Sequence, residues 1–329
     1  MSFLSAVSEL LRPVPPPSPA VQQVFERIAD LVAPMLKADP AFERQLTAPV
    51  EYALGYCDGL VAGLPGPIDI GHRAFADDPL VHALFGTADD ISLMLGRSQA
   101  VRDYLADPAC EASDHFHALF AARRQEKRQL GMSVRGDVLQ TDVPQRVLFF
   151  SDQTLVEPCC SLEHTLDKLR QRAMDSLLLS FHDHVEALRA EREGLRADLS
   201  VERGHLTVLR SGSDGPAFTL HSRHIDEIDS RLRQAAAALM PENLVQALAD
   251  FLHAPEASLS LTPVSIRVDR MGIVSEGLQA DRDAHTINFP ELNARDRRHY
   301  LVMLARVDRE EARDAVERVR DQQRRFMLI

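Results

Sequence analysis

Residues 161–210 form the longest stretch of one repeating pattern in the chain. Apolar side chains recur there at intervals of three and four residues, which is the spacing of one face of an α-helix. They are Leu162, Leu166, Leu169, Ala173, Leu177, Phe181, Val185, Leu188, Leu195, Leu199, Leu206 and Leu209. A continuous helix of about 50 residues would be roughly 75 Å long. The sequence therefore predicts a long coiled-coil-like helix that projects from its domain or crosses several layers.

The apolar seam of this helix must pack against something, because burying one leucine is worth about 1.5–3 kcal/mol. The part of the seam that we expect to form an interaction surface consists of Val185, Leu188, Leu195 and Leu199. One possible occupant is a second copy of the chain, in an antiparallel dimer that pairs Arg192 with Glu202. The other is an intramolecular helical hairpin with residues 224–252.

Composition narrows the class of protein. At 329 residues, the chain is long enough for two or three compact units. No apolar run approaches the 18 or so residues of a membrane span, and the N-terminus lacks the basic start of a secretory signal. A net charge of −12 argues against nucleic acid as a partner. The four cysteines show no metal-type spacing, and arginine greatly outnumbers lysine. We therefore expect a cytoplasmic protein of bacterial type.

Proline, glycine and turn residues divide the chain into four predicted segments. They are an N-terminal peptide with a Pro-rich tether (1–19), a helical domain (20–130), a β-hairpin followed by the long helix (131–210) and a C-terminal α+β module (217–329). The Gly- and Ser-rich residues 211–216 are the expected linker before the last segment. The predicted fold is mainly α with a smaller α+β part.

Strands are expected in two places. Segments 133–139 and 146–150 would form the hairpin, directly after a helix at 115–130. In the C-terminal module the expected strands are 259–268, 272–275, 285–289 and 300–307. Asp308 and Glu311 then make a D-x-x-E pattern, which is typical of the capped start of a helix.

Three glycines fall at four-residue spacing in the helix expected at 42–64. They are Gly55, Gly59 and Gly63. Each costs about 1 kcal/mol of helix propensity against alanine, so we expect something to offset that cost. Tight helix–helix packing in the domain core is one interpretation, and a slot for a flat or elongated ligand is the other.

Histidine pairs are the best candidates for metal ligands, because imidazole is a common ligand and titrates near neutrality. His221 and His224 are three residues apart, so they share a helical face, and Asp229 lies close by. Glu202 and His205 form a second pair at the same spacing. These matches suggest a metal site around residues 221–229.

Motifs for nucleophilic catalysis are missing. The chain has no Gly-x-Ser-x-Gly elbow, no His-Glu-x-x-His motif and no dinucleotide fingerprint. Cys159 and Cys160 are adjacent, and the two interpretations are small buried residues at a helix entry or a redox-active pair. The basic run from Arg123 to Arg128 indicates a solvated helix face or an anion site.

These observations favour a non-enzymatic interaction or regulatory protein, an adaptor or scaffold, that associates through the long amphipathic helix. Its partner would be a protein, possibly a second copy in a homodimer, and no cofactor is expected. The alternative is a metal-dependent hydrolase whose site uses His221, His224 and Asp229.

Overall fold

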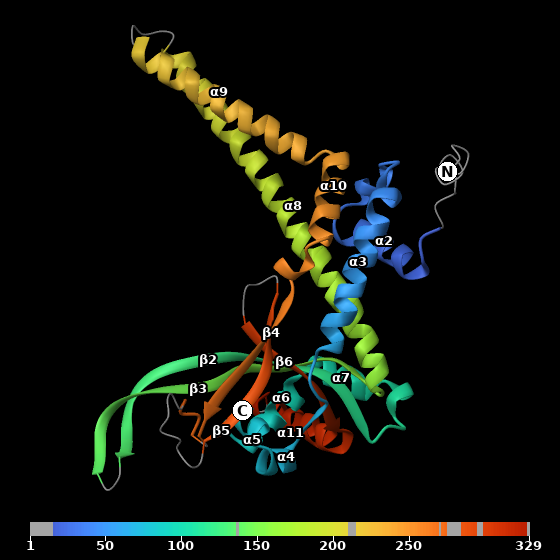
Figure 1. Cartoon of the computed structure of the whole chain (residues 1–329), viewed down its shortest axis with the longest axis vertical. Helices are drawn as coiled ribbons and strands as arrows, with labels where there is room; N and C mark the ends of the chain where they lie inside the picture. Colours follow the sequence, from blue (N-terminus) through green and yellow to red (C-terminus); the bar gives the residue numbers. More distant parts are fainter. Residues whose placement is uncertain are drawn as a thin grey trace, which may run out of the picture. The chain divides into compact units, whose positions relative to one another are not determined.

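A computed structural model describes residues 16–135, 138–209, 215–269, 271–274, 284–294 and 299–327. Most of the predicted N-terminal peptide and tether (1–15) and most of the predicted linker (211–214) lie outside these ranges. Within them the chain is a mixed α and β protein (Figure 1). No helix in this part of the chain is both long and apolar enough to cross a membrane.

The chain divides into two compact units, each assembled from two separate stretches. One contains the residues up to Gly55 together with Leu177–Pro255, and the other contains Tyr56–Ser176 together with the residues from Glu256 onward. The predicted divisions at 130/131 and 210/217 do not coincide with this partition. The physical reason is that two helices, α3 (Phe42–Ala62) and α8 (Leu162–Leu209), each contribute residues to both units.

The second unit, which we call the sheet unit, is built on a six-stranded sheet with strand order β3-β2-β6-β5-β4. The antiparallel strands are β2 (His115–Arg135), β3 (Val138–Cys159), β4 (Ser260–Val268), β5 (His285–Asn293) and β6 (His299–Asp308). The short β1 (Ile68–Ile70) pairs parallel with β6. Strand β6 therefore pairs with strands from both of the sequence stretches that make up the unit.

Helices cover one face of the sheet (Figure 1). They are α4 (His72–Asp77), α5 (Pro79–Leu84), α6 (Ala88–Arg97), α7 (Gln99–Ala106) and α11 (Arg309–Met327). Alternate residues of β2, Phe116 and Phe120 among them, are fully buried beneath these helices, as are Leu301 and Met303 of β6. Because side chains alternate across a strand, the residues between them face the other side.

The opposite face of the sheet is covered by the end of α3 and the start of α8. Val61, Leu169 and Leu304 form a small buried cluster there. Leu304 lies between Met303 and Ala305 on β6, and those two neighbours belong to the core on the first face. The first turns of the long helix are therefore a covering layer of the sheet.

The hairpin prediction was wrong in its extent. Strand β2 already begins at His115, so the helix expected at 115–130 does not form, and β2 and β3 are strands of 21 and 22 residues. The expected loop at 140–145 is part of β3, where Gln145 pairs with Gln129. Residues from Arg123 to Arg128 have high helix propensity, but ladder pairing with β3 overrides it, as tertiary context often does. The basic run is consequently a strand, not a helix face.

The C-terminal strands lie where they were predicted. β4, β5 and β6 match three of the expected segments, and Val268 bridges to Val274 across the turn that Gly272 closes on Asp269. The cap before α11 is half formed as predicted. Asp308 Oδ1 accepts the Glu311 N–H at 2.9 Å, whereas the Glu311 carboxylate accepts hydrogen bonds from His72.

The first unit, the helical unit, contains α2 (Pro19–Leu31), η1 (Pro34–Ala38), the first part of α3, the second part of α8, α9 (Gly215–Ala238) and α10 (Pro241–Leu252). Aromatic pairs join its elements: the rings of Phe25 and Phe42 lie 5.2 Å apart and those of Phe181 and Phe251 lie 5.5 Å apart. Ring pairs of this kind add to the stabilisation from area burial.

The long helix pairs with α9 within the same chain. Leu195 and Leu199 of α8 pack on Ile228, with Ile225 and Leu232 alongside, and Arg231 binds Glu191 at 2.9 Å. This is the intramolecular hairpin, one of the two occupants considered for the seam. Arg192 pairs with Glu193, and Glu202 pairs with His221. Both side chains that were expected to pair across a dimer therefore have ion-pair partners within the chain.

Candidate metal centre

Two histidine-containing pairs face each other across the α8–α9 hairpin. Glu202 and His205 are three residues apart on α8, and His221 and His224 are three residues apart on α9. Residues at this spacing share one helical face. The hairpin brings the two faces together because Leu195 and Leu199 bury against α9. Local periodicity places each pair, and the apolar seam sets where the pairs meet.

The distances identify a cluster that can hold a metal ion. One ligand atom from each of Glu202, His205 and His221 lies within 4.8 Å of the others. The His221 Nδ1 is 2.6 Å from one carboxylate oxygen of Glu202, and the His224 Nε2 is 4.0 Å from the other. The rings of His205 and His221 lie 5.7 Å apart. His224 thus lies beside the cluster, but it is outside the set whose ligand atoms are all within 4.8 Å of one another.

The carboxylate of Glu202 is ionised in this setting. The hydrogen bond from His221 holds the pKa of Glu202 below its usual range, and the nearby His221, His224 and His205 act in the same direction. Zinc and similar cations require an ionised carboxylate and neutral imidazoles as ligands. The ion would replace the His221–Glu202 hydrogen bond, because both atoms would turn toward the metal.

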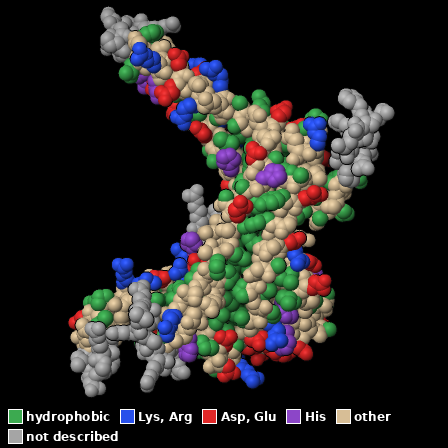
Figure 2. Space-filling model, viewed as in Figure 1, with side chains coloured by type: hydrophobic (Ala, Val, Ile, Leu, Met, Phe, Trp, Pro, Cys, Tyr) green, Lys and Arg blue, Asp and Glu red, His purple; other side chains and the backbone are tan. Residues whose placement is uncertain are grey.

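The cluster borders a surface groove of about 550 Å³ lined also by Thr219, Leu220, Arg223 and Glu227. Figure 2 shows histidine and acidic side chains close together near this end of the hairpin. His205 and His224 are exposed, whereas Glu202 and His221 are half-buried. The groove is open, so a bound ion would be reachable from solvent.

Asp229 is not part of the cluster. Its carboxylate lies 4.0 Å from Arg203 and 3.7 Å from Arg233, so this acid belongs to a surface ion pair. The acidic member is instead Glu202. The sequence contains part of the signal that identifies it, namely two pairs at equal spacing, but it left open whether the long helix packs within the chain or on a second copy.

The glycine stripe does not mark a packed interface. Gly55, Gly59 and Gly63 are all exposed, and a Cβ at Gly55 or Gly59 would meet no heavy atom within 4 Å. The interpretation as tight helix packing is therefore wrong. Close helix approach occurs instead at Gly96 of α6, where a Cβ would lie 2.5 Å from the backbone oxygen of Ala315 in α11.

The proposed interaction residues of α8 are largely covered within the chain. Val185, Leu195 and Leu199 are buried, and Leu188 is half-buried. Exposed apolar side chains do occur farther along the hairpin, where Val201, Val208 and Leu220 are 56%, 73% and 69% exposed. An association surface on the hairpin would use these residues rather than the seam.

A hydrogen-bonded chain of serine, histidine and glutamate lies in the sheet unit. The Ser92 hydroxyl is 3.3 Å from His72 Nε2, and His72 Nδ1 is 2.5 Å from the Glu311 carboxylate. The order of groups is that of a hydrolytic triad. Ser92 lies inside α6, however, and the N–H groups there are donated to the preceding turn. The helix of Ser92 therefore forms no oxyanion hole beside the hydroxyl. The hydrogen bonds between these side chains serve to hold α4 to α11.

The basic run on β2 is partly neutralised. Arg124 binds the buried Glu291 at 2.5 Å and Glu126 at 2.7 Å, and Arg146 lies 3.3 Å from Glu126. These pairs make an anion site at Arg124 unfavourable, because an incoming anion would have to displace them.

Comparison with known proteins adds no relative: no protein-family model, no curated protein and no solved structure matches the chain. The geometry of the hairpin cluster is therefore the observation on which a function can be argued.

Proposed function

We propose that the protein binds a divalent transition-metal ion between α8 and α9 and acts as a metal-responsive interaction protein. The observation that carries this proposal is the convergence of Glu202, His205 and His221, with ligand atoms within 4.8 Å of one another. Imidazole nitrogen and carboxylate oxygen are ordinary zinc ligands, at about 2.0–2.2 Å from the ion. Only small side-chain movements are needed to bring these atoms to that distance.

The donor set favours zinc among the biologically available ions. Two or three imidazoles with one carboxylate suit Zn²⁺, whereas Mg²⁺ and Ca²⁺ prefer all-oxygen sites. Cu²⁺ and Ni²⁺ bind imidazole as well, so the site is expected to accept them in the usual order of affinity. With His224 as a fourth ligand, the ion would have the four-coordinate shell typical of structural sites.

Binding is favoured over hydrolysis by the position of the cluster. Its ligands lie on two helix faces beside an open groove, and His205 and His224 are exposed. Metal hydrolases place an activated water in a shaped cavity that excludes bulk solvent. A metal that joins α8 to α9 would instead stabilise the hairpin, because a ligand bound only by the folded form shifts the folding equilibrium.

Titration calorimetry with ZnCl₂ on metal-stripped protein tests the proposal. We expect one ion per chain, and we expect His205→Gln and His221→Gln each to weaken binding at least about 10-fold, the lower end of what even outer-shell substitutions cost. His184→Gln is the matched control, because His184 is an exposed histidine on the same helix. Equal weakening in the control, or no binding by the unmodified protein, would contradict the proposal. All variants keep the four cysteines, so any zinc bound by thiols contributes equally to every titration.

A second candidate function is that of an adaptor that self-associates through the hairpin. The observation that favours it is the exposure of three large apolar side chains on the α8–α9 hairpin, Val201, Val208 and Leu220. Light scattering on the intact protein measures its mass. A dimer that Val201→Asp with Val208→Asp dissociates would support this function, and a monomer at tens of micromolar would exclude it. These positions are better tests than Leu195, whose side chain is inside the hairpin.

A further inference from the structure

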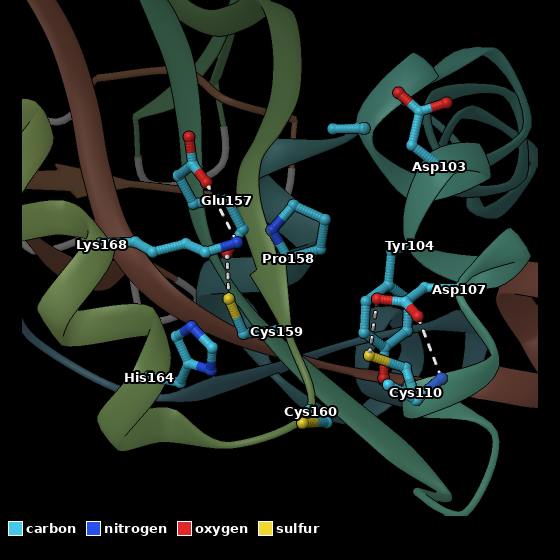
Figure 3. Close-up of a pocket in the computed structure, with 12 residues that line it drawn as sticks. Asp103, Tyr104, Asp107, Cys110, Glu157, Pro158, Cys159, Cys160, His164 and Lys168 are labelled. Carbon is cyan, nitrogen blue, oxygen red and sulfur yellow. Dashed lines mark hydrogen bonds and ion pairs between the residues drawn. The ribbon is translucent and has the colours of Figure 1, made fainter.

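Three of the four cysteines line one cavity in the sheet unit. Cys110, Cys159 and Cys160 border a space of about 490 Å³ (Figure 3). Cys110 ends the short 3₁₀ helix η2 (Pro108–Cys110), and Cys160 lies between the end of β3 and the start of α8. Segments that are distant in sequence therefore present thiols to a common space. The cavity belongs to the sheet unit, whereas the hairpin cluster belongs to the helical unit.

The three thiols have different surroundings. Cys159 is 4% exposed and lies 3.5 Å from the Glu157 carbonyl oxygen, which accepts its S–H. Cys110 is 9% exposed and contacts the Asp107 carboxylate at 3.9 Å. Cys160 is exposed. Cys110 and Cys160 border the same cavity from two segments that are distant in sequence, so these two residues are the candidate pair for a bond across it.

Burial and charge assign separate roles to the two members of this pair. Burial, together with Cys160 and Asp107, raises the pKa of the Cys110 thiol, so Cys110 stays protonated and is a poor first nucleophile. Cys160 is open to solvent and meets a dissolved oxidant first. A solvent-accessible cysteine next to a second thiol is the usual arrangement of a redox-sensing pair.

A free hydrogen-bond donor faces the same cavity. The Tyr104 side chain is 5% exposed, and within the described part of the chain its hydroxyl has no hydrogen-bond partner. Burial raises the pKa of Tyr104 to about 12, so the hydroxyl keeps its proton. A buried donor without a partner is costly, and a bound oxygen atom would satisfy it. Figure 3 shows Tyr104 beside Cys110 on the α7 side of the cavity.

We propose that Cys160 and Cys110 form a redox pair in which a hydroperoxide oxidises Cys160 and the two residues then close a disulfide. In the first step the Cys160 thiolate attacks one peroxide oxygen. The S–O bond forms, the O–O bond breaks, and the released hydroxide or alkoxide takes a proton. In the second step the Cys110 sulfur attacks the Cys160 sulfenic acid, the S–O bond breaks, and the oxygen leaves as water. Two thiols lose two electrons and two protons, and the peroxide takes up both.

The disulfide would join η2 to the β3–α8 junction at the mouth of the cavity. Both segments belong to the sheet unit, so the bond would form without any rearrangement between units. A small dithiol would reverse it by thiol–disulfide exchange. Adjacent Cys159 and Cys160 are a less favourable pair, because a disulfide between neighbouring residues closes a strained eight-membered ring.

The test is treatment of the intact, EDTA-washed protein with hydrogen peroxide, followed by non-reducing peptide mapping by mass spectrometry. We expect a cross-linked peptide pair containing Cys110 and Cys160, with a mass lower by two hydrogen atoms. The cross-link should be absent in Cys160→Ser and present in Cys159→Ser, which is the matched control because it alters the neighbouring thiol. Oxidised wild type should also melt at a higher temperature than the reduced protein, whereas Cys160→Ser should show no such difference.

In Cys110→Ser the proposal predicts a sulfenic acid that a dimedone probe traps at Cys160. A Cys159–Cys160 link, an intermolecular Cys160 link, or oxidation of Cys160 to sulfinic acid without any Cys110 cross-link would overturn the pairing. Tyr104→Phe should slow the formation of the cross-link, and an unchanged rate would overturn the role given to the hydroxyl. A far-UV circular dichroism spectrum matching wild type confirms that each variant is folded.

Discussion

Gly96 and Gly59 allow a direct test of where helices approach closely in the sheet unit. Both are helical glycines of that unit, at neither of which φ is positive. A Cβ at Gly96 would lie 2.5 Å from both the Ala315 backbone oxygen and the Val319 Cγ2, whereas a Cβ at Gly59 would meet nothing within 4 Å. Ordinary heavy-atom contacts are about 3.5–4.0 Å, so Gly96→Ala forces α6 and α11 apart.

The pair of variants separates the packing cost from the helix propensity. Replacing glycine by alanine in a helix gains about 1 kcal/mol of propensity at either position. Gly59→Ala is therefore expected to stabilise the protein by about that amount. At Gly96 the same gain is opposed by about 1–3 kcal/mol of overpacking. Because the propensity gain is common to both, the difference between the two variants measures the overpacking alone.

Urea denaturation followed by far-UV circular dichroism is the suitable assay, since the chain contains no tryptophan. The midpoints and slopes give the free energy of unfolding for each variant. We expect Gly96→Ala to be less stable than Gly59→Ala by about 1–3 kcal/mol. Equal stabilisation by the two substitutions would refute the close contact between α6 and α11, whereas destabilisation by Gly59→Ala would restore the glycine stripe as a site of packing.

Contacts of three other side chains predict three further outcomes. Leu195→Asp removes a buried leucine and adds a charge. Replacement by alanine alone would lower the free energy of unfolding by about 2–5 kcal/mol. Hydrogen exchange should therefore become faster in α9 around Ile228, while exchange in the sheet is unaffected. Burial, with a smaller effect of Asp58, raises the pKa of Cys57 to about 12, so at pH 8 this thiol should react with Ellman's reagent only after denaturation. Because Cys160 is exposed and reacts promptly, the reaction is read at the Cys57 peptide by mass spectrometry, and prompt labelling there in the native protein would show that Cys57 is accessible. The hydrogen bond from Arg306 lowers the pKa of Asp69, so the pair stabilises the fold above the unfolded pKa of about 4, and this contribution is lost as the pH falls through the folded value. Both side chains are about half exposed, so Arg306→Gln should have a small effect at pH 7 and should flatten the acid limb of the stability profile.

Features governed by neighbours in sequence were predictable. The three- and four-residue spacing of α8 identified a helix that the structure shows as 48 residues long, and the apolar runs of β4, β5 and β6 identified strands close to their observed bounds. Asp308 was recognisable as a helix cap because its partner, the Glu311 N–H, is three residues away. Each of these patterns expresses backbone geometry that a short segment imposes on itself.

Strand β2 shows where local patterns mislead. Phe116, Ala118, Phe120 and Ala122 alternate as buried residues of a strand, and that period was present in the sequence. The charged residues from Arg123 onward have high helix propensity, and this propensity obscured the strand-type alternation. Pairing with β3 and β6 decides the outcome, since a strand is stabilised by partners that are distant along the chain.

For the candidate metal centre, the sequence by itself determined that Glu202 with His205, and His221 with His224, share helical faces, because a spacing of three residues allows nothing else in a helix. Only the tertiary structure decided that the two faces meet, that Glu202 rather than Asp229 is the acidic member, and that Cys110 and Cys160 border one cavity. The register of α8 on α9 comes from the burial of Leu195, Leu199 and Ile228. A linear sequence does not contain that register, because it results from the packing of surfaces that only the folded chain brings together.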